Sequence, residues 1–291
     1  MKKLIYCFLL LMPQIVLADD QEFTGGIGLS EPFSMQVQMC ALREGVKQAD
    51  YDELIRDYFD WSVKHEVEVT FVRQVPLFTH DNLSKPNPYD FVEFLATSFE
   101  TQGKGWDKWL NTPDGQKLNE RWQKLAHCDV KMANEFMLWA DFEQMNSDNE
   151  RVVVWNWCDR NPGVTWEQMN LKHRDMLQNR SEDRSNIGWA LFFPHFGGAN
   201  APAEFAHGIV YPDVESLMND AGNYASGGWR FSEDYRNAYA SCQGRYVMAE
   251  TIMRRPGDWP GFGGTNAPRP FCSLGMGGST GSPVVWGQPR G

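Results

Sequence analysis

The sequence lacks the features that mark several large classes of protein. It has 27 Lys and Arg residues against 38 Asp and Glu, which gives a formal net charge of −11, and no basic cluster stands out. Nucleic-acid binding depends on Lys and Arg that displace counterions from phosphates, so this acidic chain is not expected to bind nucleic acid. It also has no P-loop, no G-x-G-x-x-G after a strand, no G-x-S-x-G and no H-E-x-x-H. These absences disfavour a nucleotide enzyme, a serine hydrolase and a zinc protease.

Long apolar runs are confined to the start of the chain. Residues 4–17 are almost all apolar, follow two lysines and end in a Val-Leu-Ala sequence typical of a signal peptidase site. We therefore expect a signal peptide over residues 1–18, cleaved after Ala18, and a secreted or periplasmic protein. An uncleaved anchor is the alternative, although the run is short for a spanning helix and is interrupted by Pro13. No integral membrane span is expected after cleavage.

Cysteines are few, and their context is informative. The sequence has six, of which one lies in the expected signal. In an oxidising compartment an even number of the rest should pair. The remaining five are Cys40, Cys128, Cys158, Cys242 and Cys272.

The chain repeats itself once. Superposing Cys40 on Cys158 also superposes Gly45 on Gly163, Arg56-Asp57 on Arg174-Asp175, Pro76 on Pro194 and Phe78 on Phe196. After a short deletion in the next loop, Cys128 falls on Cys242. Each copy has the pattern of a strand, a helix, two strands, a helix and a strand. This order is that of a ferredoxin-like βαββαβ unit, and the length of the repeat indicates a duplicated domain.

The repeat predicts how the cysteines pair. In a ferredoxin-like unit the first and last strands are antiparallel neighbours, and Cys40 ends the first strand while Cys128 begins the last. The second copy places its cysteines in the same way. We therefore predict the disulfides Cys40–Cys128 and Cys158–Cys242. A metal site or a catalytic thiol is the alternative reading of the same residues.

The pattern divides the chain into six segments. They are a signal peptide (1–18), an N-terminal arm (19–35), ferredoxin-like repeat 1 (36–140), an acidic linker (141–150), ferredoxin-like repeat 2 (151–255) and a Gly/Pro-rich tail (256–291). The first helix is expected over about 50–64, with Asp50 and Glu53 placed as in a capping box, and its counterpart should start near Thr165. The tail is expected to be extended or disordered, and it could mediate a homo-oligomer or bind a protein partner.

Two tandem ferredoxin-like units in one chain resemble the dimeric α+β-barrel superfamily. This group includes stress-responsive barrel proteins, antibiotic-biosynthesis monooxygenases and chlorite-dismutase-like haem proteins. The resemblance implies an α+β fold in which two sheets face each other as an intramolecular barrel with helices outside. It rests on the element order and the duplication over residues 36 to about 255, and no specific family is recognised. Functions in the superfamily range from cofactor-free oxygenation through haem chemistry to binding, so the fold leaves the function open.

A cavity between the two sheets would be the default ligand site. Along the first strand of each copy, Gln38 and Asn156 alternate with Val/Met and Trp/Trp pairs. We expect the apolar faces to pack under helices, and Gln38 and Asn156 to point between the sheets as ligand-binding residues. The alternative is that this polar pair forms hydrogen bonds across a dry seam. Arg73, beside Glu93 on a neighbouring strand, could bind an anion or belong to a structural ion pair.

The candidates for catalysis are His195, His207 and Glu93. The two histidines flank a predicted hairpin, near Glu204, and could act as an acid–base pair or an open metal site. Chance placement of two half-buried histidines is the alternative, because the first copy has Leu77 and Glu93 at these positions. His173, on a predicted helix, could be an axial haem ligand, but a core position is favoured since its counterpart is Ile55.

These observations predict a protein that binds a small, partly apolar molecule between the sheets. A cofactor-free oxygenase or isomerase and a non-enzymatic protein-interaction module are the alternatives. No metal and no cofactor is expected, with a metal at His195 and His207 or a haem as the disfavoured options.

Overall fold

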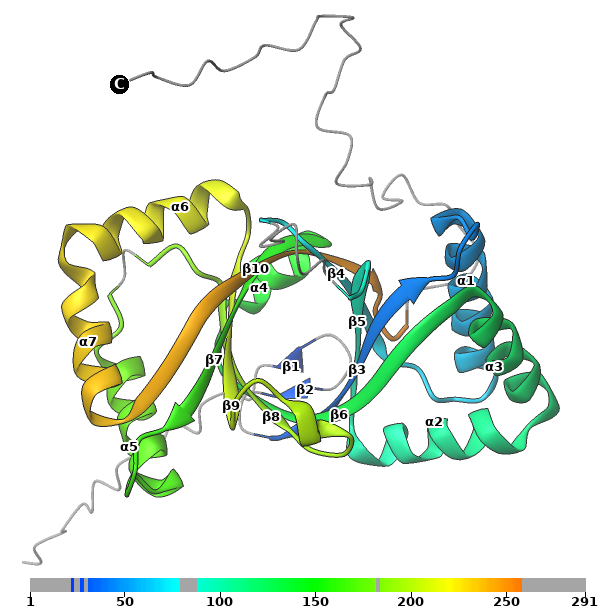
Figure 1. Cartoon of the computed structure of the whole chain (residues 1–291), viewed down its shortest axis with the longest axis horizontal. Helices are drawn as coiled ribbons and strands as arrows, with labels where there is room; N and C mark the ends of the chain where they lie inside the picture. The colour runs from blue at the N-terminus through cyan, green and yellow to red at the C-terminus, as the bar shows by residue number, and fades with distance from the viewer. Residues whose placement is uncertain (1–21, 24–26, 29–30, 79–87, 182–183, 258–291) are drawn as a thin grey trace, which may run out of the picture.

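The structure is a computed structural model that describes residues 22–23, 27–28, 31–78, 88–181 and 184–257. In this part of the chain, eight strands close into an antiparallel barrel and helices lie outside it (Figure 1). The expected α+β class is confirmed. The barrel strands are β3 (Phe33–Leu42), β4 (Thr70–Pro76), β5 (Phe91–Thr97), β6 (Ala126–Ala140), β7 (Glu150–Arg160), β8 (Gly188–Pro194), β9 (Phe205–Tyr211) and β10 (Ala240–Arg254). Two short strands, β1 (Glu22–Phe23) and β2 (Ile27–Gly28), form a separate pair.

The strands follow the same order in both halves of the chain. Around the barrel the order is β10-β4-β5-β3-β6-β8-β9-β7, and β7 pairs with β10 to close it. The first half thus contributes β4-β5-β3-β6 and the second half β8-β9-β7-β10. The halves join where β6 pairs with β8, with Ala133 opposite Pro194, and where β10 pairs with β4, with Met248 opposite Pro76.

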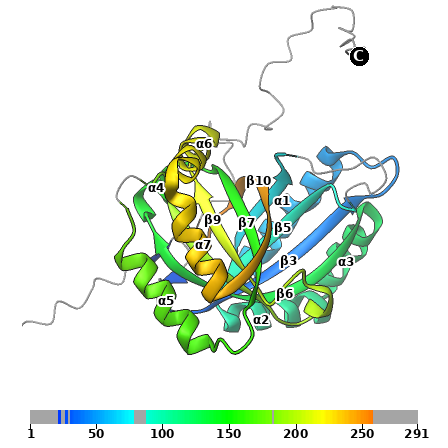
Figure 2. The same ribbon diagram turned by 60° about the vertical axis from the view of Figure 1, so that its left-hand side comes forward.

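Helices from each half cover the outside of its own strands (Figure 1; Figure 2 shows the second half in front). They are α1 (Gln48–Lys64), α2 (Phe99–Asn111), α3 (Pro113–Leu125), α5 (Trp166–Gln178), α6 (Val214–Asn223) and α7 (Trp229–Ala238), with single turns η1 (Gly198–Asn200) and η2 (Tyr224–Gly228). The short helix α4 (Phe142–Ser147) instead packs Phe142 and Met145 into the interior core of the barrel. The helix predicted near Thr165 begins there, since Thr165 and Gln168 form a capping box. In α1, Asp50 is the third residue of the helix and accepts a hydrogen bond from the backbone of Lys47, so this helix starts before the predicted position.

Both faces of the barrel wall are buried. The interior core includes Phe33, Met35, Val37, Val92, Phe94, Val153 and Phe192, with Met39, Trp155 and Trp157 packed against it. The outer faces pack under helices, around Cys40 and Tyr51 in the first half and Cys158 and Met169 in the second. The expectation that Gln38 and Asn156 point between the sheets was therefore wrong, because the Val/Met and Trp/Trp faces fill the interior. A sheet buried on both sides does not reveal its inner face through alternation.

Both predicted disulfides are confirmed. Cys40 on β3 lies directly opposite Cys128 on β6, with the Cα atoms 4.1 Å apart. Cys158 on β7 lies opposite Cys242 on β10, with the Cα atoms 4.0 Å apart. The disulfides are compatible with an extracellular location.

Several expected segments lie partly or wholly outside the described residues. These include the signal peptide, most of the tail with Cys272, and part of the N-terminal arm, whose last residues already belong to β3. The acidic linker contains the short helix α4. Among the described residues, no helix combines the length and the apolar character needed to cross a membrane.

Candidate functional site

The barrel encloses a cavity of about 310 Å³. Apolar and aromatic side chains form most of its wall: Val37, Met39, Val92, Phe94, Trp155, Trp157, Phe192, Pro194 and Met248. Gln74, Tyr89, Asn200 and Tyr246 add polar groups, and the segment around η1 borders the same space. A mostly apolar hollow with a few polar groups is the usual character of a small-molecule site.

Trp155 is the centre of the aromatic wall. Its ring stacks on Phe94 with the centroids 5.6 Å apart and meets Phe192 edge-on at 5.5 Å. Gly208 lies opposite Trp155 in the β7–β9 ladder, and a Cβ atom at this glycine would come within 3.2 Å of the indole. The glycine therefore leaves room for the ring to lie flat against the neighbouring strand.

A chain of hydrogen bonds leads from this wall to buried charges. The Trp155 indole N–H donates to Gln74 Oε1 at 2.8 Å, and Gln74 Nε2 donates to Glu250 Oε2 at 2.6 Å. The other oxygen of Glu250 lies 3.7 Å from the Nε atom of Arg151, whose side chain is only 3% exposed. Burial lowers the pKa of Arg151, and Glu250 opposes that shift. Gln74 therefore links the aromatic wall of the cavity to the buried Glu250.

Glu135 lies inside the same barrel wall. On β6 it lies two residues from Ala133 and two from Met137, which both belong to the interior core. Every second residue of a strand faces the same side, so Glu135 also faces the interior. Burial, with a smaller contribution from the charge of Glu250, raises the pKa of Glu135 to about 8. Its Oε2 atom is buried and has no hydrogen-bond partner among the described residues. At neutral pH this residue is a protonated carboxylic acid, a form able to donate a proton.

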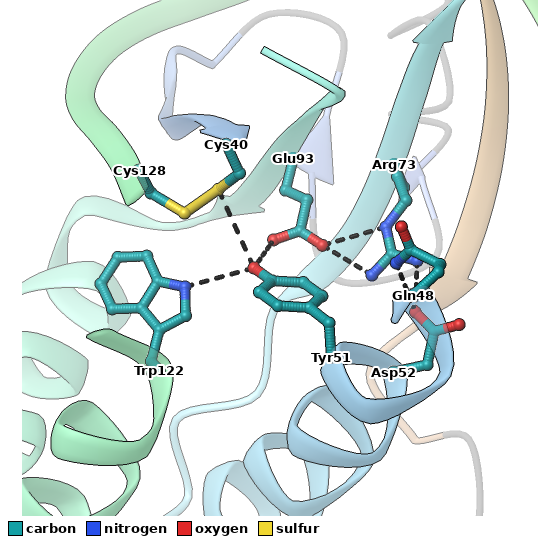
Figure 3. A network of polar contacts seen from close by, with 8 residues as sticks. All are labelled: Cys40, Gln48, Tyr51, Asp52, Arg73, Glu93, Trp122 and Cys128. Atoms are coloured by element: carbon teal, nitrogen blue, oxygen red, sulfur yellow. Dashed lines mark hydrogen bonds and ion pairs between the residues drawn. A yellow bond between two sulfur atoms is a disulfide. The ribbon is translucent and has the colours of Figure 1, made fainter. Parts of the chain in front are cut away.

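The structure brings Arg73 and Glu93 together, but outside the barrel (Figure 3). Arg73 donates from Nε and Nη2 to Glu93 Oε1 at 3.0 and 2.8 Å, and from Nη1 to Asp52 at 2.6 Å. The Tyr51 hydroxyl donates to the other oxygen of Glu93 at 2.8 Å. Burial raises the pKa of Glu93, while Arg73 pulls it down. This network lies beside the Cys40–Cys128 disulfide, and none of its residues lines the barrel cavity.

His195 and His207 do not form the expected pair. His195 is exposed and contacts the Phe196 ring, whereas His207 is buried under α5 and α7 with His173 and Tyr235. The Nε2 atoms of both buried histidines lie within hydrogen-bond distance of the Tyr235 hydroxyl, at 3.0 Å for His173 and 3.2 Å for His207.

The direction of this hydrogen-bond chain follows from Trp189. The Trp189 indole can only donate, and it bonds to His207 Nδ1 at 3.0 Å. Neutral His207 therefore carries its proton on Nε2 and donates to Tyr235, whose hydroxyl donates onward to His173. The proton of His173 then lies on Nδ1, a buried atom without a partner among the described residues. Burial lowers the pKa of His173 to about 4 and that of His207 to about 3, so both are neutral at pH 7.

A metal site that uses His207 and the two nearby cysteines would need free thiols. Cys158, Cys242 and His207 present ligand atoms within 4.8 Å of one another. The two sulfur atoms are bonded to each other in the disulfide, so they offer no thiolate in this state.

The predicted ligand-binding pair lies on the helix side of the barrel wall. Asn156 donates from Nδ2 to the carbonyl of Gln243 at 2.7 Å. Gln38 borders a second, smaller cavity of about 70 Å³ beneath α1, α2 and α3.

Comparisons with known proteins add a fold-level finding. No family model matches the chain, and no curated protein matches it. Solved structures of the α+β-barrel class are similar to it. A monooxygenase-like protein from Fusobacterium nucleatum is 9% identical, with 77% of this chain and 94% of that chain covered and a TM-score of 0.45. A dye-decolorizing peroxidase from Bacteroides thetaiotaomicron is 9% identical, with 80% and 95% covered and a TM-score of 0.45. A chlorite-dismutase-like protein is 11% identical, with 76% and 95% covered and a TM-score of 0.41.

The expectation of a chain without a cofactor is corrected by this finding. The neighbours include a peroxidase and a chlorite-dismutase-like protein, classes that bind haem. The described residues do not fit haem as they stand, because neither cavity is lined by a histidine. The Nε2 atoms of His173 and His207 are both within hydrogen-bond distance of the Tyr235 hydroxyl, so neither is free to bind an iron atom.

Four residues near the cavity were missed from the sequence: Gln74, Glu135, Arg151 and Glu250. In each case the neighbouring residues on the same face of the strand are apolar. Glu135, for example, lies between Ala133 and Met137. A single polar residue within a series of buried apolar residues was the feature of the sequence that could have identified them.

Proposed function

We propose that the protein binds a small, partly apolar, aromatic molecule inside the barrel. The observation that carries this proposal is the cavity of about 310 Å³ walled by Phe94, Trp155 and Phe192. Ligand pockets occupy roughly 300–1,000 Å³, so a molecule of one or two fused rings suits this volume. The polar atoms of Gln74 give one anchoring point for a hydroxyl or carbonyl group.

The proposal includes the architecture that creates the cavity. Two ferredoxin-like units, over residues 36–140 and 151–255, supply one half of the barrel each. The repeated strand order and the equivalent disulfides support a tandem duplication. A secreted or periplasmic location is part of the same proposal, supported by the disulfides.

A binding experiment with 1-naphthol tests the proposal. Calorimetric titration of the oxidised protein should give a saturable, one-site curve. Val92→Trp fills the cavity and should weaken binding at least tenfold. Leu171→Trp adds an indole on the surface, where Leu171 is 59% exposed, and should leave binding unchanged. If both variants bind naphthol like the wild type while remaining folded by circular dichroism, the ligand does not occupy the barrel and the proposal fails.

Proton transfer on a bound ligand is the second candidate, favoured by Glu135. A protonated carboxylic acid beside the Glu250 carboxylate could supply a donor and an acceptor for isomerisation. Binding is preferred because neither carboxyl group lines the cavity. Deuterium exchange at the carbon next to the carbonyl of 2-tetralone measures such transfer. If exchange is not accelerated by the wild type, or is equally fast with Glu135→Gln, this second function is excluded.

An interaction module without a ligand is disfavoured by the cavity itself. That class predicts no cavity large enough for a ligand, whereas the barrel holds one of about 310 Å³.

A further inference from the structure

The smaller cavity lies on the other side of the barrel wall from the proposed ligand site. It lies between the barrel wall and α1, α2 and α3, which lie together over the first half of the barrel (Figure 1). Its volume is about 70 Å³, and the residues that line it include no charged side chain. An ion in this space would have no partner of opposite charge, so a ligand here should be uncharged.

Aromatic rings form one side of this cavity. Tyr58 stacks on Trp61 with centroids 5.9 Å apart, and Trp61 meets Trp109 edge-on at 5.3 Å. Trp109 in turn meets Trp122 edge-on at 6.4 Å. These rings therefore pack against one another along this side of the cavity.

Two buried polar atoms of the lining residues have no hydrogen-bond partner in the part of the chain that the structure describes. One is the indole N–H of Trp61, a residue only 5% exposed, and the other is Oε1 of Gln102. Buried polar groups are nearly always hydrogen-bonded, so each such exception needs an explanation. The cavity borders both residues and offers space for a molecule that would bond to them.

The orientation of the Gln102 amide is fixed by its neighbours. Its Nε2 atom donates to Gln36 Oε1 at 2.8 Å, and the Trp106 indole donates to the same oxygen at 2.8 Å. Turning the amide over would bring two carbonyl oxygens together. The unpaired atom of Gln102 is therefore an acceptor, while that of Trp61 is a donor.

A glycine keeps the cavity open. Gly105 lies within α2 and lines the cavity, and a Cβ atom there would meet only Val67 Cβ at 3.8 Å, an ordinary contact. Glycine weakens a helix interior relative to alanine, so its presence is not explained by helix stability. A larger side chain at this position would fit the backbone and occupy the cavity.

We propose that this cavity is a second binding site, for a small uncharged molecule bearing a primary amide group. The amide carbonyl accepts from Trp61, and its NH₂ group donates to Gln102. An apolar cavity of about 150 Å³ is known to hold benzene, so this smaller space takes a group of a few heavy atoms. The site is independent of the barrel cavity, because the two have no lining residue in common.

The test uses propionamide and butanone as a matched pair of ligands. Both have an acceptor and similar size, but butanone has no donor for Gln102. Titration of the oxidised protein, followed by NMR chemical shifts of the indole N–H signals, should give saturable propionamide binding in the millimolar range. Butanone should bind at least tenfold more weakly.

Two glycines of the same helix provide the matched variants. Gly105→Leu should abolish propionamide binding, whereas Gly103→Leu, at a position with nothing within 4 Å, should leave it unchanged. Both variants should still bind 1-naphthol as the wild type does, which separates this proposal from the barrel site. If Gly105→Leu does not fold, Trp61→Phe decides, with an expected loss of at least tenfold.

The proposal is overturned by any of three results. They are no propionamide binding at 100 mM, equal binding of propionamide and butanone, and unchanged propionamide binding in folded Gly105→Leu or Trp61→Phe.

Discussion

Glu135 and Glu250 share the interior of the barrel, and the negative charge of Glu250 adds to the burial that raises the pKa of Glu135 to about 8. Glu250 accepts a hydrogen bond from Gln74 and lies 3.7 Å from Arg151, whereas the buried Oε2 atom of Glu135 has no partner among the described residues. The raised pKa of Glu135 gives the barrel a pH-dependent stability.

Glu135→Gln should remove part of that dependence. The folded pKa of Glu135 lies above its unfolded value of 4.5, so the folded state binds more protons and stability falls as pH rises from about 4.5 to about 8. The variant should be more stable than wild type at pH 7, by on the order of 3 kcal/mol, and nearly equal at pH 4.5. Urea unfolding at pH 4.5, 7 and 9 measures the difference, with the exposed Glu233→Gln as control. A difference that does not change with pH would contradict the shift.

The buried histidines should act in the opposite direction. Burial lowers the pKa of His173 to about 4, so the unfolded chain binds more protons and stability is lost as pH falls from about 6.5 to 4. His173→Leu should reduce this acid loss, by about 3 kcal/mol at pH 4. His195→Leu removes an exposed histidine and should leave the profile as it is. Thermal unfolding at pH 7, 5.5 and 4 distinguishes the two, and identical profiles for wild type and His173→Leu would refute the assignment.

The disulfide register was predictable because it depends on strand order alone. A βαββαβ unit places its first strand beside its last, so Cys40 and Cys128 become neighbours whatever the side chains around them. The inner face was not predictable in this way. Val37 and Met39 suit either a helix interface or a barrel interior, and only closure of the barrel decides between them.

The polar cluster in the barrel depends on contacts between the halves. Gln74 meets Glu250 because β4 pairs with β10, a pairing between strands far apart in the chain. Local periodicity carries no information on such a pairing. Glu93 was identified from its neighbour Arg73 because these two residues lie on adjacent strands of one half.

Breaking the Arg73–Glu93 pair should destabilise the fold without affecting ligand binding. Arg73→Met leaves the fully buried Glu93 without its cation, and loss of one partner of a buried pair costs about 3–5 kcal/mol. Adding Glu93→Gln should recover much of that loss. Lys64→Met breaks the exposed contact with Asp114 and should leave the stability nearly unchanged, because solvent screens an ion pair at the surface. Urea unfolding gives these values. A loss of naphthol affinity in a folded Glu93→Gln variant would instead support the functional role predicted from the sequence.

The two disulfides should stabilise the protein by similar amounts, because they occupy equivalent places and close loops of similar length. The cysteines are 88 residues apart in the first pair and 84 in the second. In the chain-entropy model a loop of this length is worth about 4–5 kcal/mol. The variants Cys40→Ala/Cys128→Ala and Cys158→Ala/Cys242→Ala should therefore show comparable losses in urea, and the reduced wild type a larger one. If one double variant matches the oxidised wild type, that bridge does not constrain the unfolded chain, and the equivalence of the two halves does not extend to their stability.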